Sequence, residues 1–265
     1  MRDGHIHTPF CPHGSNDSLE RYIERAIELG YTDISFTEHA PLPSTFVDPT
    51  PEQDSAMAME QLDSYLSTLQ RVKKQYQADI TIRIGLEVDF IVGYEEATAR
   101  FLEQVGPELD DSILSVHFLP ANDQYFCLDY SPKMFQAMVE SFGSTIHAYE
   151  AYYEAVLHAV QADLGKYKPK RIGHLTLVHK FQKLFPCPVS MNERIVHILD
   201  EMKDRQYELD YNGAGVQKPL CQEPYPPDWV VYEAQKRKIP LVYGSDAHCA
   251  RDLHQGKGQM VREAL

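Results

Sequence analysis

Residues 3–37 read DGHIHTPFCPHGSNDSLERYIERAIELGYTDISFT, and this stretch decides the fold. Its two ends, residues 3–7 and 33–37, are short runs typical of β-strands. Between them, apolar residues recur at helical spacing over residues 19–27, and Gly30 marks the end of the helix. Two strands joined by a crossover helix form a βαβ unit, in which the strands are parallel. The stretch therefore predicts an α/β fold built on a parallel sheet.

The alternation of strands and helices continues to the end of the chain. We expect seven strands, at residues 3–7, 33–37, 80–90, 113–116, 171–175, 207–211 and 241–243. Further helices are predicted over roughly 54–77, 93–105, 132–164 with a break near Gly143, 191–206 and 228–238. The Pro-rich stretches 41–51 and 219–227 are long connections, because strand and helix signals resume on both sides. These signals favour one α/β domain over residues 1–265, folded as a closed or nearly closed β/α barrel.

The composition excludes several classes of protein. The chain has 265 residues, and no apolar run approaches the roughly 18 residues that a membrane span needs. Its formal charge of −14 opposes attraction to nucleic acid or anionic lipid, since both favour clustered Lys and Arg. The five cysteines form no C-x-x-C pair and no leader-like segment precedes the first strand, so we expect reduced thiols and a cytoplasmic location. Twelve histidines are the one compositional excess.

Candidate metal ligands lie at or just past the carboxyl ends of the predicted strands. They are His5 and His7 on the first strand, His39 after the second, Glu87 on the third, His117 after the fourth, His174 on the fifth, and Asp246 and His248 after the seventh. In a β/α barrel, side chains from separate strand ends converge on this face, where active sites are built. His5 and His7 are two residues apart on a strand, so they point the same way and can hold one ion. Glu87 interrupts an apolar strand, where an unpaired carboxylate would be costly to bury.

A structural role is the alternative for each of these residues. A lone histidine is more often a core or surface residue than a ligand. Backbone groups could satisfy the first two histidines, Glu87 could pair with an Arg, and Asp246 could cap the last helix. The joint placement at strand ends favours a metal site over these alternatives. Histidines without such a placement are expected to be ordinary surface or core residues: His147, His158, His179, His197 and His254.

The chain resembles the PHP superfamily, the polymerase and histidinol phosphatase phosphoesterases. The motifs that carry the resemblance follow the family's order: Asp3-Gly4-His5-Ile6-His7, Thr37-Glu38-His39, Gly85-Leu86-Glu87, Ser115-Val116-His117, Gly173-His174-Leu175 and Ser245-Asp246-Ala247-His248. Within the superfamily the chain is most similar to the monofunctional histidinol-phosphate phosphatases, in the stretches 7–14, 115–119, 173–185 and 215–219. The resemblance implies a distorted (β/α)7 barrel that hydrolyses L-histidinol phosphate to L-histidinol and phosphate in histidine biosynthesis.

The resemblance also implies a site for three divalent metal ions, which would be Zn, Mn or Fe. One ion would be held by His5, His7, Glu87 and Asp246, a second by Glu87, His117 and His174, and a third by His13, His39 and His248. A hydroxide that bridges the two ions sharing Glu87 would attack phosphorus in line, because metal binding can lower the pKa of water from about 15.7 to about 7. The leaving alkoxide would take its proton with help from His39, His248 or Asp246.

A basic side chain is expected to grip the phosphate, and the candidates are Arg171, Lys180 and Lys218. Where the related phosphatases are expected to carry Gly-Leu-Arg-Lys, this chain reads Gly215-Val216-Gln217-Lys218, and His179 stands where Arg is common.

The net charge of the expected metal centre supports an anionic substrate independently of the resemblance. Three divalent ions bring about +6 and two carboxylate ligands about −2, which leaves roughly +4. The Pro-rich loops should overhang the barrel mouth. There Asp48, Glu52 and Glu223 could meet the amine of histidinol phosphate or be solvated loop charges.

Three other functions are alternatives. A PHP-type phosphoesterase or nuclease acting on another phosphomonoester, a nucleotide or an oligonucleotide shares the metal motifs, but the acidic balance and the lack of a basic stripe oppose it. A metal-dependent amidohydrolase also collects His and Asp at strand ends, but would normally show a Lys-type bridging carboxylate or fewer ligands. A metal-storage or regulatory module would not need nine well-placed ligands. We therefore expect a small phosphomonoester as the partner, and neither nucleic acid nor a membrane.

Overall fold

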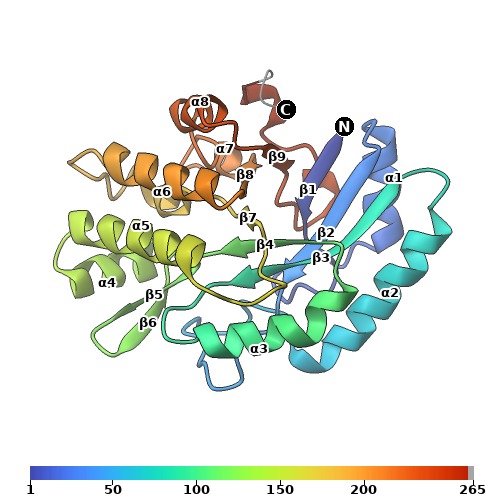
Figure 1. Ribbon diagram of the computed structural model, residues 1–265, viewed down its shortest axis with the longest axis horizontal. Helices are drawn as coiled ribbons and strands as arrows, with labels where there is room; N and C mark the ends of the chain where they lie inside the picture. Colours follow the sequence, from blue (N-terminus) through green and yellow to red (C-terminus); the bar gives the residue numbers. More distant parts are fainter. Residues whose placement is uncertain (262–265) are drawn as a thin grey trace.

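A computed structural model of the protein, described over residues 1–261, contains a seven-stranded parallel sheet that curves into a nearly closed barrel (Figure 1). The strands lie in the order β1 Arg2–Ile6, β2 Asp33–His39, β3 Thr81–Asp89, β4 Asp111–Ser115, β7 Arg171–Ile172, β8 Glu208–Asn212 and β9 Leu241–Gly244. The chain beyond β9 returns to β1, because Ile6 and Ala247 form a parallel bridge and the His7 N–H donates to the Ala247 carbonyl at 3.1 Å. The predicted distorted (β/α)7 barrel is confirmed. Residues 262–265 of the predicted domain lie outside the described residues.

Helices cover the outside of the sheet, as Figure 1 shows. They are α1 Leu19–Glu28, α2 Leu62–Gln75, α3 Glu95–Val105, α4 Pro132–Phe142, α5 Thr145–Gln161, α6 Asn192–Asp204 and α8 Asp228–Lys236. The short α7 Ala214–Gln217 instead follows the carboxyl end of β8. The connections include 3-10 turns at η1 Met59–Gln61, η2 Gly106–Glu108, η3 Leu177–Phe181, η4 Ala250–Asp252 and η5 Lys257–Gln259. The apolar stripe of α1 forms its buried face, and the Ser18 hydroxyl caps the helix by accepting from the Arg21 N–H. The predicted break at Gly143 is confirmed, because this residue has a φ of +81° between α4 and α5.

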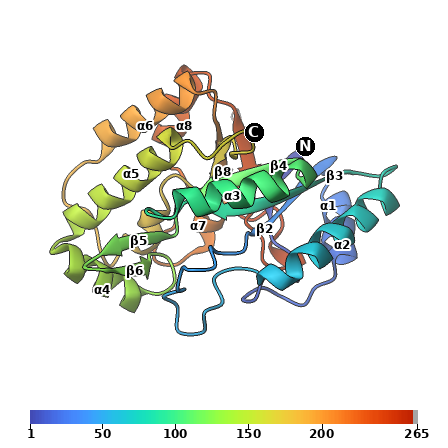
Figure 2. The same cartoon turned by 60° about the horizontal axis from the view of Figure 1, so that its bottom comes forward.

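Two strands that the sequence analysis did not predict follow β4. They are β5 Phe118–Ala121 and β6 Gln124–Cys127, which form an antiparallel hairpin beside α4 (Figure 2). Asn122 and Asp123 make its two-residue turn with φ values of +49° and +61°, a conformation that Asn and Asp tolerate better than most residues. The hairpin projects from the carboxyl end of the barrel. Its residues therefore become part of the walls around the strand ends.

Two predicted elements are shorter than expected. The strand predicted at 171–175 pairs only at Arg171 and Ile172, because the His174 N–H turns to the Asp210 carboxylate at 3.3 Å. The helix predicted over 54–77 begins only at Leu62, after a 3-10 turn at Met59–Gln61. In both places the unpredicted irregular backbone lies at the carboxyl end of the barrel, where it carries side chains into a cavity described below.

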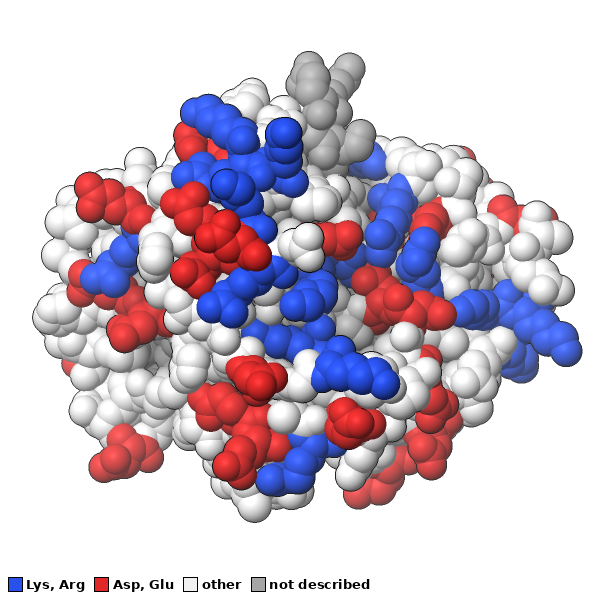
Figure 3. All heavy atoms as spheres, in the orientation of Figure 1, with Lys and Arg blue, Asp and Glu red and all other residues white. Residues whose placement is uncertain are grey.

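Acidic and basic side chains are interspersed on the face drawn in Figure 3. Ion pairs between acidic and basic side chains include Arg83 with Asp33 at 2.8 Å and Lys73 with Asp110 at 2.5 Å. Exposed pairs of this kind contribute little to stability. Over residues 1–261, none of the helices combines the length and the apolar character needed to cross a bilayer.

Replacing Gly85 by Ala should lower the free energy of unfolding by about 1–3 kcal/mol, the usual effect of overpacking. A Cβ at Gly85 on β3 would lie 2.2 Å from the Asp111 carbonyl oxygen on β4, and that backbone cannot withdraw without separating the two strands. Gly258→Ala is the control, because nothing lies within 4 Å of its added Cβ. Denaturant unfolding followed by circular dichroism measures both variants. Equal stability of the two would contradict this packing argument.

Candidate metal centre

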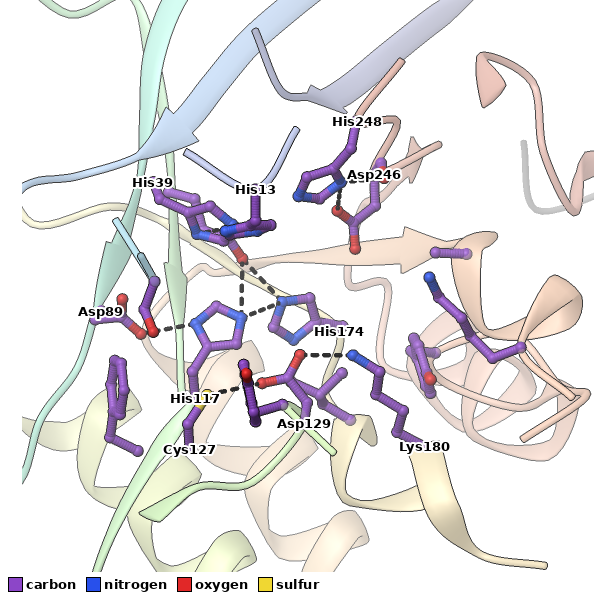
Figure 4. Close-up of a pocket in the computed structure, with 18 of the residues that line it drawn as sticks. His13, His39, Asp89, His117, Cys127, Asp129, His174, Lys180, Asp246 and His248 are labelled. Atoms are coloured by element: carbon purple, nitrogen blue, oxygen red, sulfur yellow. Dashed lines mark hydrogen bonds and ion pairs between the residues drawn. The ribbon is translucent and has the colours of Figure 1, made fainter. Parts of the chain in front are cut away.

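The carboxyl ends of the strands surround a cavity of about 420 Å³ (Figure 4). Seven of the nine predicted metal ligands line it: His13, His39, Glu87, His117, His174, Asp246 and His248. The other two, His5 and His7, are fully buried beneath it. Parallel register explains part of this convergence, because His39 at the end of β2 pairs with Glu87 on β3. The structure thus brings together residues from both ends of the chain.

Glu87 occupies the middle of the cluster, and its two carboxylate oxygens face different imidazoles. Its Oε2 lies 3.3 Å from His5 Nε2 and 3.5 Å from His7 Nε2. Its Oε1 lies 2.8 Å from His174 Nε2 and 3.7 Å from His117 Nε2. Burial opposes the charge of this carboxylate, but His5 and His117 hold its pKa well below the usual range. One carboxylate is therefore placed to share its two oxygens between two ions.

Asp246 is the second carboxylate of the cluster. Its Oδ1 lies 3.1 Å from His7 Nε2 and 3.8 Å from His5 Nε2, while the Asn212 amide donates to Oδ2 at 3.2 Å. The Asp246 backbone has a φ of +53°, and its N–H donates to the His5 carbonyl at 2.8 Å. A left-handed backbone at a residue other than glycine is uncommon and clusters at functional sites. This conformation turns the carboxylate from the end of β9 toward the histidines of β1.

Three further carboxylates orient the histidines, and the sequence analysis gave none of them this role. Asp210 accepts from His5 Nδ1 at 2.9 Å, Glu38 faces His7 Nδ1 at 3.1 Å, and Asp89 faces His117 Nδ1 at 2.7 Å. Each contact commits one ring nitrogen and leaves Nε2 for an ion, which is the usual environment of a metal-bound histidine. Asp89 could have been found from the sequence. It lies two residues after Glu87 on one strand, so both side chains point to the same face.

Three groups of possible ligand atoms occur among residues 1–261, and the atoms within each group lie within 4.8 Å of one another. The first two groups are His5, His7 and Glu87, and Glu87, His117 and His174. The third contains His7, Cys11, His39 and His248. The ring of His13 also lies near the third group, with centroids 5.2 Å from His39 and 5.1 Å from His248. Cys11 was not among the predicted ligands.

Several buried nitrogen atoms in this cluster lack a hydrogen-bond partner: His5 Nε2, His7 Nε2, His39 Nδ1 and His174 Nδ1. Buried polar atoms are normally satisfied, so such a concentration is costly without a ligand. Imidazole nitrogens and carboxylate oxygens are suitable donors for zinc, iron and manganese. The donor set therefore fits divalent metal ions.

The neighbouring carboxylates hold protons on part of the cluster. Burial opposes a charge on His7, but the carboxylates of Asp246, 3.1 Å from Nε2, and of Glu38, 3.1 Å from Nδ1, raise its pKa to about 9. Burial likewise opposes a charge on His117, and Asp89 is the main cause that raises its pKa to about 10. Both imidazoles therefore carry a proton at neutral pH when no metal replaces it.

Two of the three predicted phosphate-binding cations line the cavity, and the third does not. Lys180 and Lys218 are at its wall, and Figure 4 shows the Lys180 ammonium against Asp129, 2.9 Å from Oδ2. Arg171 lies at the amino end of β7 instead, where its buried guanidinium donates to Asp111 at 2.7 Å and to the Gly4 carbonyl at 2.8 Å. The prediction that Arg171 binds phosphate is wrong, because strand direction places it at the opposite end of the barrel from the cavity.

The loop carboxylates suggested for the substrate amine do not line the cavity. Asp48 accepts hydrogen bonds within its own loop, Glu52 accepts from the Tyr130 hydroxyl at 2.7 Å, and Glu223 contacts His179 at 2.6 Å. The carboxylates at the cavity wall, apart from the metal-ligand candidates, are Asp54, Asp89, Asp129 and Asp252. The sequence analysis missed Asp129 because it follows the unpredicted hairpin.

The chain matches the PHP domain family over residues 3–214. It is 50% identical to the histidinol-phosphatase of Bacillus subtilis over 254 residues, which covers 95% of each chain. It is 34% identical to the probable histidinol-phosphatase of Deinococcus radiodurans over 251 residues, which covers 93% of this chain and 85% of the other.

Solved structures agree with these matches. A crystal structure from Listeria monocytogenes, described as that of a candidate histidinol phosphatase, has a TM-score of 0.94 at 41% identity and covers 98% of this chain and 100% of its own. A histidinol phosphate phosphatase from Lactococcus lactis, crystallised with zinc, L-histidinol and phosphate, has a TM-score of 0.73. At 20% identity, over 99% of this chain and 93% of the other, it shows the shared fold.

Metal binding should release protons at neutral pH. Because the pKa values of His7 and His117 are raised to about 9 and about 10, an incoming ion must displace a proton from each imidazole. The apparent metal affinity should therefore increase as the pH rises toward these values and fall as the pH drops. Calorimetric titration of chelator-treated protein with zinc, in buffers of different ionisation enthalpy, measures the proton count. Release of fewer than about one proton near pH 7 would contradict the raised pKa values.

Proposed function

The chain belongs to the PHP domain family, and from this premise we propose that it hydrolyses L-histidinol phosphate to L-histidinol and phosphate. Identity of 50% to a histidinol-phosphatase along nearly the whole of both chains supports this substrate. The observation in the structure that carries the proposal is the position of Glu87. One of its carboxylate oxygens faces the imidazole of His5 and the other faces the imidazole of His174. Such a reaction belongs to histidine biosynthesis, and we place the enzyme in the cytoplasm.

We propose three divalent ions in this centre, of zinc, manganese or iron. The first would be held by His5, His7, Glu87 and Asp246, the second by Glu87, His117 and His174, and the third by His13, His39 and His248. When bound, these ions would lower the pKa of water and neutralise the charge of the phosphate. The three orienting carboxylates described above hold the imidazoles ready for this role.

Three of the ligand side chains are also proposed to assist the leaving group. The alkoxide of histidinol is a poor leaving group, so its oxygen needs a proton or another positive charge. Asp246, His39 and His248 all line the cavity. The His248 Nδ1 is hydrogen-bonded to the Asp246 carbonyl at 3.1 Å, so only its Nε2 is available to an ion or a substrate. These residues are the candidates for assisting the leaving oxygen, and His248 would donate a proton to it only from a state in which its Nε2 is not bound to an ion.

Lys180 and Lys218 are proposed to hold the phosphate. The pKa of Lys180 is raised even though burial opposes its charge, because Asp129 lies beside the ammonium. Lys180 therefore enters the reaction as a cation, already aimed at the cavity that also exposes His117 and His174. A preformed cation at that position costs little reorganisation when the phosphate arrives.

Acidic side chains at the wall of the same cavity suit the rest of the substrate. Histidinol phosphate carries an ammonium and an imidazole, and Asp54 and Asp252 stand at the wall as possible partners. A nucleic acid would instead need a continuous basic surface. On the face drawn in Figure 3, acidic side chains lie among the basic ones. A small cationic phosphomonoester is therefore the better fit.

The substrate proposal is tested by comparing kcat/KM for L-histidinol phosphate with the values for other phosphomonoesters, such as p-nitrophenyl phosphate, and with cleavage of a single-stranded oligonucleotide. We expect a preference of about a hundredfold or more, because basic and acidic groups at the cavity wall would meet both the phosphate and the ammonium of L-histidinol phosphate. Removal of metal by a chelator should abolish activity, and added zinc, manganese or iron should restore it. Full activity without metal, or equal activity on every phosphomonoester, would contradict the proposal.

Lys180→Gln should reduce kcat/KM for L-histidinol phosphate by about 10²–10³-fold, the effect of losing one donor to a developing oxyanion. Lys183→Gln is the matched control, because Lys183 is exposed three residues away and does not line the cavity. Steady-state kinetics with metal content measured in parallel separates a loss of phosphate binding from a loss of ions. A Lys180→Gln enzyme as active as the control would exclude Lys180 from phosphate binding.

A further inference from the structure

We propose that the thiolate of Cys11 is a direct ligand of the metal ion held by His39 and His248. This inference rests on the proposed function, since it assumes that the centre binds metal ions. It adds a sulfur atom to a centre otherwise built from imidazole and carboxylate groups. On binding, the thiol proton is released to solvent as the metal–sulfur bond forms.

The first observation is the position of the sulfur. Cys11 Sγ lies within 4.8 Å of ligand nitrogens on His7, His39 and His248, and these nitrogens lie equally close to one another. Cys11, His39 and His248 can supply three ligands of one tetrahedral zinc ion, while the His7 Nε2 belongs to the neighbouring ion proposed above. Cys11 is 5% exposed, whereas His13 in the same loop is an exposed residue. Of the two possible ligands in this loop, the Cys11 sulfur is therefore the one on the buried side of the site.

The second observation is that the surrounding nitrogens are available. His248 contacts the Asp246 carbonyl through Nδ1, so its Nε2 is left for another partner. The His39 Nδ1 is buried and has no hydrogen-bond partner, although Glu87 Oε2 lies 3.3 Å away. A buried nitrogen without a hydrogen bond, beside the buried sulfur, indicates a missing ligand rather than ordinary core packing.

The loop around Cys11 is built to hold the sulfur in place. The Cys11 N–H donates to the Thr8 carbonyl at 3.0 Å, and the Gly14 N–H donates to the Cys11 carbonyl at 3.1 Å. A Cβ at Gly14 would lie 3.0 Å from the Cys11 Cβ, so glycine lets the loop close tightly. The Ser15 N–H then donates to the His248 carbonyl at 2.9 Å. These bonds tie the cysteine loop to the segment that carries His248.

A sulfur ligand would make this ion different from the other two. Thiolate is a soft donor that favours zinc over manganese, whereas imidazole and carboxylate groups accept several metals. We therefore expect the position beside Cys11 to retain zinc most selectively. The exposed His13 can complete the coordination from the solvent side, because its ring lies beside His39 and His248.

The test uses cobalt, because a bond between thiolate and Co²⁺ gives an intense near-ultraviolet charge-transfer absorption that imidazole and carboxylate ligands do not give. Chelator-treated full-length protein is reloaded with Co²⁺ as wild type, as Cys11→Ser and as Cys221→Ser. Cys221 is an equally buried cysteine whose Sγ lies 3.6 Å from the Glu223 carbonyl oxygen, and it belongs to none of the three ligand groups. We expect the absorption in wild type and Cys221→Ser, and its loss in Cys11→Ser.

Zinc-edge X-ray absorption of the wild-type protein provides a second measurement that needs no variant to fold. A bound cysteine adds a scatterer at about 2.3 Å to the nitrogen and oxygen shell at about 2.0–2.2 Å. A metal-loaded wild type without the sulfur shell or the cobalt band would overturn the proposal, as would a band that persists in Cys11→Ser. Protein that binds no metal would contradict both this proposal and the proposed function. A sulfur-ligated protein that does not hydrolyse histidinol phosphate would contradict only the proposed function.

Discussion

The burial of one carboxylate, Glu87, among imidazoles is the constraint on which the rest of the structure depends. A charge in the interior of a barrel is costly unless several partners compensate it. His5 on β1 and His174 just after β7 supply such partners, and Ser115 at the end of β4 donates to Oε1 at 2.6 Å. All of these groups must arrive at the same height in the barrel. The strand register is therefore tied to the chemistry of the centre.

The buried polar side chains are arranged in layers around the centre of the cluster. Ligand candidates face the centre, and a second layer of Asp210, Glu38 and Asp89 holds their other ring nitrogens. At the opposite end of the barrel, Arg171 is bonded to Asp111 and closes the base. Charged residues are thus buried at both ends of the strands, but those at the carboxyl ends line the cavity that holds the metal-ligand candidates, whereas Arg171 lines a separate cavity at the amino ends. This division follows the usual separation of catalytic and stabilising faces in β/α barrels.

The irregular segments explain how a common fold can acquire a particular substrate. The hairpin of β5 and β6 leads to Asp129, and the loop before α2 carries Asp54 to the cavity wall. Loops of this kind vary more easily than the strands they follow, because they lie outside the main core. Lys180 donates a hydrogen bond to Asp129 and lines the same cavity as the metal-ligand candidates. The walls of the cavity can therefore vary while the metal-ligand candidates at the strand ends stay the same.

The sequence by itself determined the class of fold and predicted that the metal-ligand candidates converge from the strand ends, because alternating periodicities and residues such as His5 and Glu87 are visible along the chain. It did not reveal which other groups meet these candidates across the barrel. Only the tertiary structure decided that Asp210 orients His5, that Arg171 lies at the base and that Cys11 lies beside His39 and His248. The physical reason is that periodicity reports which face a side chain takes within its own element, whereas distances between elements depend on register, strand direction and loop path.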